Sequence, residues 1–226
     1  MVLAIVRKEL RETWAFAALA LGVCFIYVSR LTGQGGPLLK NLFEYLPLFI
    51  VEPVDVPFVR DDFSFMFFVI GTMLAIALGF RQSAWEPSQG TALYLLHQPL
   101  SRRSIFLTKL LTGIGLLLAC TLLPILIYAA WAATPGTHPG PFEWSMTGPA
   151  FRVWTLMPLV YLGSFASGIR PGRWFGSRLL PLVAVAVPAI FAYTVPLWWP
   201  TGFPVLLVVG AVLLSDILWI AATRDF

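Results

Sequence analysis

Residues 81–109 read RQSAWEPSQGTALYLLHQPLSRRSIFLTK, and this polar stretch separates two long apolar runs of the chain. Residues 63–80 precede it and residues 105–133 follow it, and each run is long enough to cross a bilayer as a helix. Its one acid is Glu86, and its bases are Arg81, Arg102, Arg103 and Lys109. Basic loops beside membrane spans stay in the cytoplasm. The pattern therefore predicts two transmembrane helices joined by a cytoplasmic loop.

The composition of the whole chain is that of a membrane protein. Hydrophobic residues make up 58% of the 226 residues, charged residues 12%, and the mean hydropathy is +0.83. An average soluble chain carries about 25% charged residues. The net charge of +4 includes no basic tract suited to nucleic acid, so we expect no nucleic-acid partner. Cys24 and Cys120 lie inside apolar runs, where we expect neither a disulfide nor a metal ligand.

We expect an all-α polytopic membrane protein with six transmembrane helices, forming a single transmembrane domain over residues 1–226. The expected spans are about 14–31, 63–80, 105–133, 152–169, 179–199 and 203–222. Residues 32–62 form a long outer loop, which lies at the interface or dips into the membrane, and residues 81–104 form a cytoplasmic loop.

Residues 1–13, MVLAIVRKELRET, carry too many charges for a signal peptide. Their apolar residues can share one helical face opposite the charges, and these are Val2, Leu3, Val6 and Leu10. We expect either an amphipathic helix lying at the membrane surface or a solvated beginning of span one.

The distribution of Lys and Arg sets the orientation of this topology. The inner side holds eleven of the fifteen bases: Arg7, Lys8, Arg11, Arg81, Arg102, Arg103, Lys109, Arg170, Arg173, Arg178 and Arg224. The outer side holds the other four: Arg30, Lys40, Arg60 and Arg152. We expect an integral protein of a bacterial or archaeal cytoplasmic membrane, with both termini in the cytoplasm.

The loop at 81–104 has local signals of ordered structure. Ser83 and Glu86 have the spacing of a capping box, and Gly90 interrupts the segment. Thr91 can cap a second short helical turn, and Ser101 can cap the helix that follows. These signals favour a docking element, although an amphipathic loop on the inner leaflet is the alternative.

The same loop resembles a known family. Its residues follow the order E-x-x-x-G-T-…-L-L-x-x-P-x-S-R-R-…-K, which is similar to the first cytoplasmic loop of ABC-2 type transporter permeases. The resemblance implies a coupling helix that binds a separate ABC ATPase subunit, with a second permease copy or paralogue beside this chain in the bilayer. The coupling residues that it implies are Glu86, Gln89, Gly90, Thr91, Leu95, Arg102 and Arg103.

Several chemical motifs are absent from the sequence. No G-x-x-x-x-G-K-[ST] occurs, so we expect no cofactor on this chain and ATP on a partner subunit. Residues 163–168, GSFASG, contain serines, but small residues within a span favour close helix packing over catalysis. We therefore expect a permease that is not itself an enzyme, and the family resemblance implies an exporter. The alternatives are an intramembrane protease or lipid-modifying enzyme, for which we find no polar cluster at one depth, and an assembly factor.

Asp216 is the one acid well inside an expected span. An intramembrane acid is a functional candidate by default. It lies about 9 Å from the inner end of the span, so Arg178 or Arg81 could pair with it. Structural pairing and a role in substrate binding or gating both remain open.

Overall fold

The computed structural model describes residues 2–33, 56–59, 62–85, 100–170, 177–195 and 198–223. Within these ranges the fold is helical and contains no strand. The α-helices are α1 (Val2–Leu31), α3 (Phe63–Ser83), α6 (Arg102–Ala132), α7 (Gly148–Ile169), α8 (Leu180–Thr194) and α9 (Phe203–Thr223). A short 3-10 helix, η2 (Trp144–Thr147), precedes α7, and a π-helical turn, η4 (Trp198–Gly202), precedes α9.

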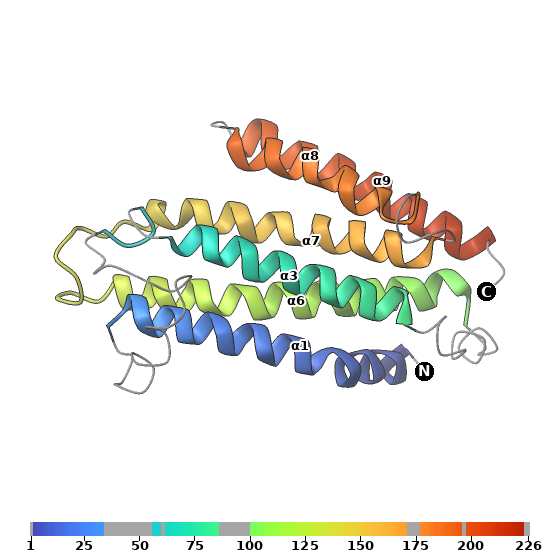
Figure 1. The fold of residues 1–226 in the computed structure, drawn as a ribbon, viewed down its shortest axis with the longest axis horizontal. Coiled ribbons are helices and arrows are strands. Elements are labelled where there is room, and N and C mark those ends of the chain that lie inside the picture. The colour runs from blue at the N-terminus through green and yellow to red at the C-terminus, as the bar shows by residue number, and fades with distance from the viewer. Residues whose placement is uncertain are drawn as a thin grey trace.

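The helices run back and forth along one long axis (Figure 1). Helices α1, α3 and α6 lie on one side of α7, and the α8–α9 hairpin lies on its other side. Both chain termini lie at the same end of the bundle, beside the end of α3 and the beginning of α6. The last residue of α3, Ser83, and the first residue of α6, Arg102, therefore lie at the end of the bundle that also carries the termini.

An α-helix lies over each range that the sequence predicts as a span, but the helices are not equivalent. Four are long and apolar enough to cross a membrane, and these are α1, α3, α6 and the helical segment Trp198–Thr223. Helix α8 is apolar but shorter, because it ends at Thr194 instead of continuing to residue 199. Helix α7 has the length, but Arg152 and its glycines and serines lower its hydropathy.

Small residues let α7 pack closely against its neighbours, which makes it the most buried helix. A side chain at Gly168 would collide with Ser83 of α3, and one at Gly79 of α3 would collide with Ser164. The Ser164 hydroxyl donates to the Ala75 carbonyl of α3 over 3.2 Å. The GSFASG segment is thus a helix-packing surface, as the sequence predicted, and its serines contact backbone groups of adjoining helices.

Aromatic side chains close the end of the bundle away from the termini. The Phe58 ring lies 4.6 Å from the Tyr128 ring and 5.3 Å from the Phe63 ring, measured between centroids. His138 lies close by, with its Nε2 atom 2.8 Å from the Ala132 carbonyl. The Phe58, Phe63 and Tyr128 rings are buried and form part of the hydrophobic core at this end of the bundle.

Candidate functional site

The predicted coupling residues divide into two groups. Five of them lie outside the described residues: Glu86, Gln89, Gly90, Thr91 and Leu95. Arg102 and Arg103 open α6, and the Arg103 side chain is exposed. The capping prediction for Ser101 is confirmed, because its Oγ atom accepts a hydrogen bond from the Ser104 amide over 3.2 Å.

The capping box predicted for Ser83 and Glu86 stays a prediction, because Glu86 lies outside the described residues. Ser83 is the last residue of α3, and its hydroxyl donates to the Gly79 carbonyl over 2.6 Å. Helix α3 continues through the polar residues Arg81 and Gln82, both of which have partners on other helices. Helix α3 therefore extends three residues beyond the predicted end of span two.

A cluster of buried polar side chains joins four helices near the end that carries the termini. It consists of Glu9 of α1, Gln82 of α3, Lys109 of α6 and Tyr161 of α7, and we call it the polar cluster. The Lys109 Nζ atom lies 3.5 Å from the Glu9 carboxylate and donates to the Gln82 carbonyl over 3.3 Å. The Tyr161 hydroxyl donates to the Gln82 Oε1 atom over 2.5 Å. Each helix thus contributes one side chain to a continuous set of polar contacts.

The polar cluster is closed to solvent. The side chains of Lys109 and Glu9 are 4% and 2% exposed, and Tyr161 is fully buried. Gly113 leaves the room that the cluster needs, because a Cβ atom there would collide with Tyr161 and Gln82. A buried charge pair is strongly destabilising to break, since removal of one partner leaves the other charge desolvated. The cluster therefore constrains the relative positions of the four helices.

A second, more exposed ion-pair set lies next to the polar cluster. The Glu12 carboxylate lies 3.3 Å from Arg81 of α3 and 3.7 Å from Lys8 on its own helix. Arg81 also stacks over the Trp85 ring, with its guanidinium carbon 4.8 Å from the ring centroid. Helix α1 is therefore ion-paired to α3 through Glu12 and to α6 through Glu9.

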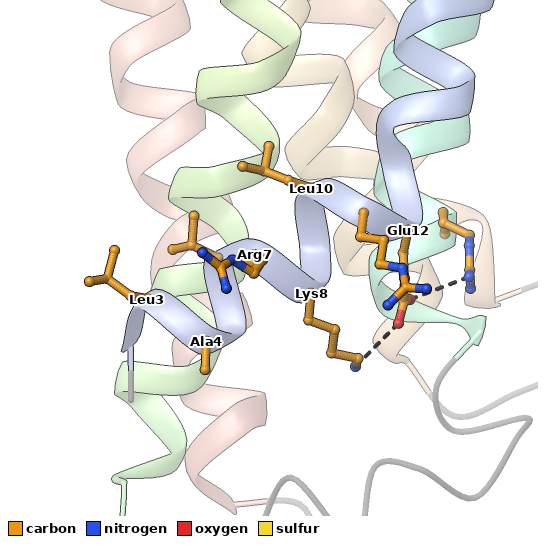
Figure 2. A pocket seen from close by; sticks show the side chains of 9 residues that line it. Leu3, Ala4, Arg7, Lys8, Leu10 and Glu12 are labelled. Atoms are coloured by element: carbon orange, nitrogen blue, oxygen red, sulfur yellow. Dashed lines mark ion pairs between the residues drawn. The ribbon is translucent and has the colours of Figure 1, made fainter.

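Helix α1 orients its two acids by its own periodicity. Ile5, Glu9 and Thr13 are buried at a spacing of four residues, so one face of α1 points into the bundle. Figure 2 shows the first turns of α1 running across the bundle before the ribbon turns along it near Glu12. The expected segments 1–13 and 14–31 thus form one helix that changes direction.

Asp216 pairs with an arginine, although the partner is neither of the two expected. Arg170, at the end of α7, donates to the Asp216 carboxylate of α9 over 2.7 Å. Arg178 instead donates to the Ser167 and Gly168 carbonyls over 3.3 and 3.0 Å. Arg178 thereby satisfies carbonyls that the end of an α-helix leaves without intrahelical donors.

The polar cluster was not predicted from the sequence. No set of polar residues was expected to meet inside the spans, whereas Glu9, Gln82, Lys109 and Tyr161 are joined by polar contacts. The signal that could have found it is Lys109, a lone base inside the range predicted as span three, which needs an acidic partner. Within the described residues no group of three His, Cys, Asp or Glu side chains is arranged to hold a metal ion.

Comparison of the chain with protein-family models, with curated proteins and with solved structures gives no match. The fold defines the class: the part of the chain that the structure describes is all-helical, and its four long apolar helices are compatible with an integral membrane protein.

Proposed function

We propose that the chain is the membrane-spanning subunit of an ATP-dependent transporter of the ABC-2 type, acting as an exporter. The observation that carries the proposal is the sequence signature that contains Glu86, Gly90 and Thr91 between α3 and α6 and the Arg102–Arg103 pair at the beginning of α6. A coupling element must be attached firmly to the spans that it moves. Both helices that flank this loop are ion-paired to α1.

The mechanism follows from where the fixed contacts lie. Gln82 lies at the end of α3, and Lys109 lies about 10 Å along α6 from the first residue of that helix. Closure of an ATPase dimer would push on the loop that connects α3 to α6, between Gln82 and Lys109. Because the polar cluster joins α1, α3, α6 and α7, a displacement of the loop would move these four helices together, relative to α8 and α9.

The proposal includes six spans, with α7 and α8 crossing the membrane together with the four apolar helices. Helix α7 is shielded from lipid by its neighbours, so it tolerates lower hydropathy than a lipid-facing span. Six crossings place both termini and the loop on the cytoplasmic side, which agrees with the distribution of Lys and Arg. ATP would be held by a separate ATPase subunit, and a second permease copy or paralogue would complete the transporter.

Two substitutions in the loop test this proposal. Glu86→Ala and Gly90→Val should leave membrane insertion intact, since neither residue belongs to an apolar run. Both should lower the ATPase turnover of the reconstituted complex, measured with membrane abundance in parallel. Glu143→Ala is the matched control, because it removes an exposed acid at the opposite end of the bundle. If both loop variants have normal abundance and unchanged ATPase turnover, the segment is only a surface loop and does not couple to the ATPase.

A further inference from the structure

A broad groove lies along the first turns of α1, on the outer side of the polar cluster. Its volume is about 1180 Å³. Its described lining combines several basic side chains with the apolar side chains of Leu3 and Leu10. Figure 2 shows Leu3, Arg7 and Lys8 extending from the same stretch of α1, where it runs across the bundle. In the part of the chain that the structure describes, Arg81 is the one lining residue outside α1, so α1 provides most of the described site.

The groove has an excess of positive charge. Among the described residues that line it, the bases are Arg7, Lys8, Arg11 and Arg81, and the one acid is Glu12. Glu12 is already shared between Lys8 and Arg81. Arg7 and Arg11 are exposed, and within the described residues neither forms an ion pair. The two arginines are four residues apart on one helix, a spacing that lets both side chains reach one anion.

Apolar side chains border the arginines on the same helix. Leu3 is 81% exposed and Leu10 is 39% exposed, and Trp14 one turn further on is 63% exposed. These residues lie away from the buried face formed by Ile5, Glu9 and Thr13. The apolar face expected from the sequence thus points out of the protein. Arginines beside exposed leucines and a tryptophan are typical of a helix in the membrane interface.

We propose that this groove binds the head group of an anionic phospholipid, with Arg7 and Arg11 on the phosphate and Leu3 and Leu10 against the acyl chains. Guanidinium groups form paired, charge-assisted hydrogen bonds with phosphate oxygens. A free phosphate would use the arginines but leave the leucines in water. The apolar border therefore favours the phosphate of a lipid. The proposal requires membrane insertion and does not depend on transport.

The first test compares ligands on the full chain in detergent by native mass spectrometry. The probes are phosphatidylglycerol, phosphatidylcholine of the same chain length, and inorganic phosphate. Phosphatidylglycerol should bind most tightly, and excess inorganic phosphate should displace little of it. Equal binding of the two lipids would overturn the proposal. Full displacement by inorganic phosphate would also overturn it, because the site would then recognise free phosphate.

The second test compares charge-matched variants. Arg7→Gln should weaken phosphatidylglycerol binding about fivefold and Arg7→Gln/Arg11→Gln about thirtyfold, as expected for removal of membrane-facing bases. Arg103→Gln removes an exposed base at the same end of the bundle but outside the groove, and it should change binding less than twofold. Leu3→Ser should weaken phosphatidylglycerol binding and leave phosphate binding unchanged.

All these side chains are exposed, so the variants should fold normally, and their melting temperatures check this directly. Equal losses for Arg7→Gln and Arg103→Gln would refute a defined site and leave only general attraction to negative charge. Unchanged lipid binding in the double arginine variant would refute it as well.

Discussion

Lys109→Met should destabilise the protein by about 3–5 kcal/mol, because it leaves the Glu9 carboxylate buried without its cation. In the structure the two groups lie 3.5 Å apart, and their side chains are 4% and 2% exposed. For a chain of this size such a loss corresponds to a fall in melting temperature on the order of 10 °C. The assay is thermal unfolding of the purified chain in detergent, followed by circular dichroism and by loss of the monodisperse chromatographic peak.

Two further variants separate the ion pair from general effects of substitution. Glu9→Gln/Lys109→Met removes both charges and should recover most of the lost stability, since an uncharged pair carries no desolvation cost. Lys8→Met breaks the more exposed pair with Glu12, whose side chains are 33% and 30% exposed, and should cost less than about 1 kcal/mol. The reasoning is refuted if Lys109→Met melts like Lys8→Met, or if the double variant is less stable than Lys109→Met alone.

Three other predictions follow from the same structure. In a cysteine-free background, Thr134→Cys should react with an impermeant thiol reagent in intact cells, and Arg103→Cys should react only after permeabilisation. The reverse pattern would show that the chain has the opposite orientation in the membrane. Asp216→Asn should keep normal abundance because the amide oxygen still accepts a hydrogen bond from Arg170, whereas Asp216→Leu should lower abundance. Loss of transport in the Asp216→Asn variant at normal abundance would indicate that the charge is needed for function. Gly113→Ala should lower the melting temperature because its methyl group would enter the polar cluster, whereas Gly115→Ala, which has open space around its Cβ position, should not. Equal effects of the two substitutions would show that the polar cluster can accommodate the extra methyl group.

The membrane-crossing part of each helix could be predicted from local sequence because its apolar residues are nearly continuous in the chain. Ser101 could be assigned as a cap because its partner amide is only three residues away. The end of α3 could not be predicted, because Arg81 and Gln82 remain helical through contacts with Glu12 and Tyr161 on other helices. Local sequence patterns predict contacts between residues that are close in the chain, but not contacts between residues on different helices.

The polar cluster was hidden from sequence reasoning for the same reason. Glu9 lies in a charged stretch that is typical of an exposed surface, yet α1 turns it into the bundle. Its partner Lys109 is a hundred residues further along the chain. The partner of Asp216 was misassigned because Arg170 and Arg178 are close in sequence, and only the fold directs Arg178 to the end of α7.

Site-specific photo-crosslinking tests most directly whether the loop between α3 and α6 contacts an ATPase, as we propose. A photoreactive amino acid is placed at Leu93 in the loop, and at Trp144, an exposed residue at the opposite end of the bundle, as the control. The account predicts that Leu93 crosslinks to a chain containing G-x-x-x-x-G-K-[ST] and that Trp144 does not. Crosslinking of Leu93 only to lipid, in membranes that contain such an ATPase, would contradict it.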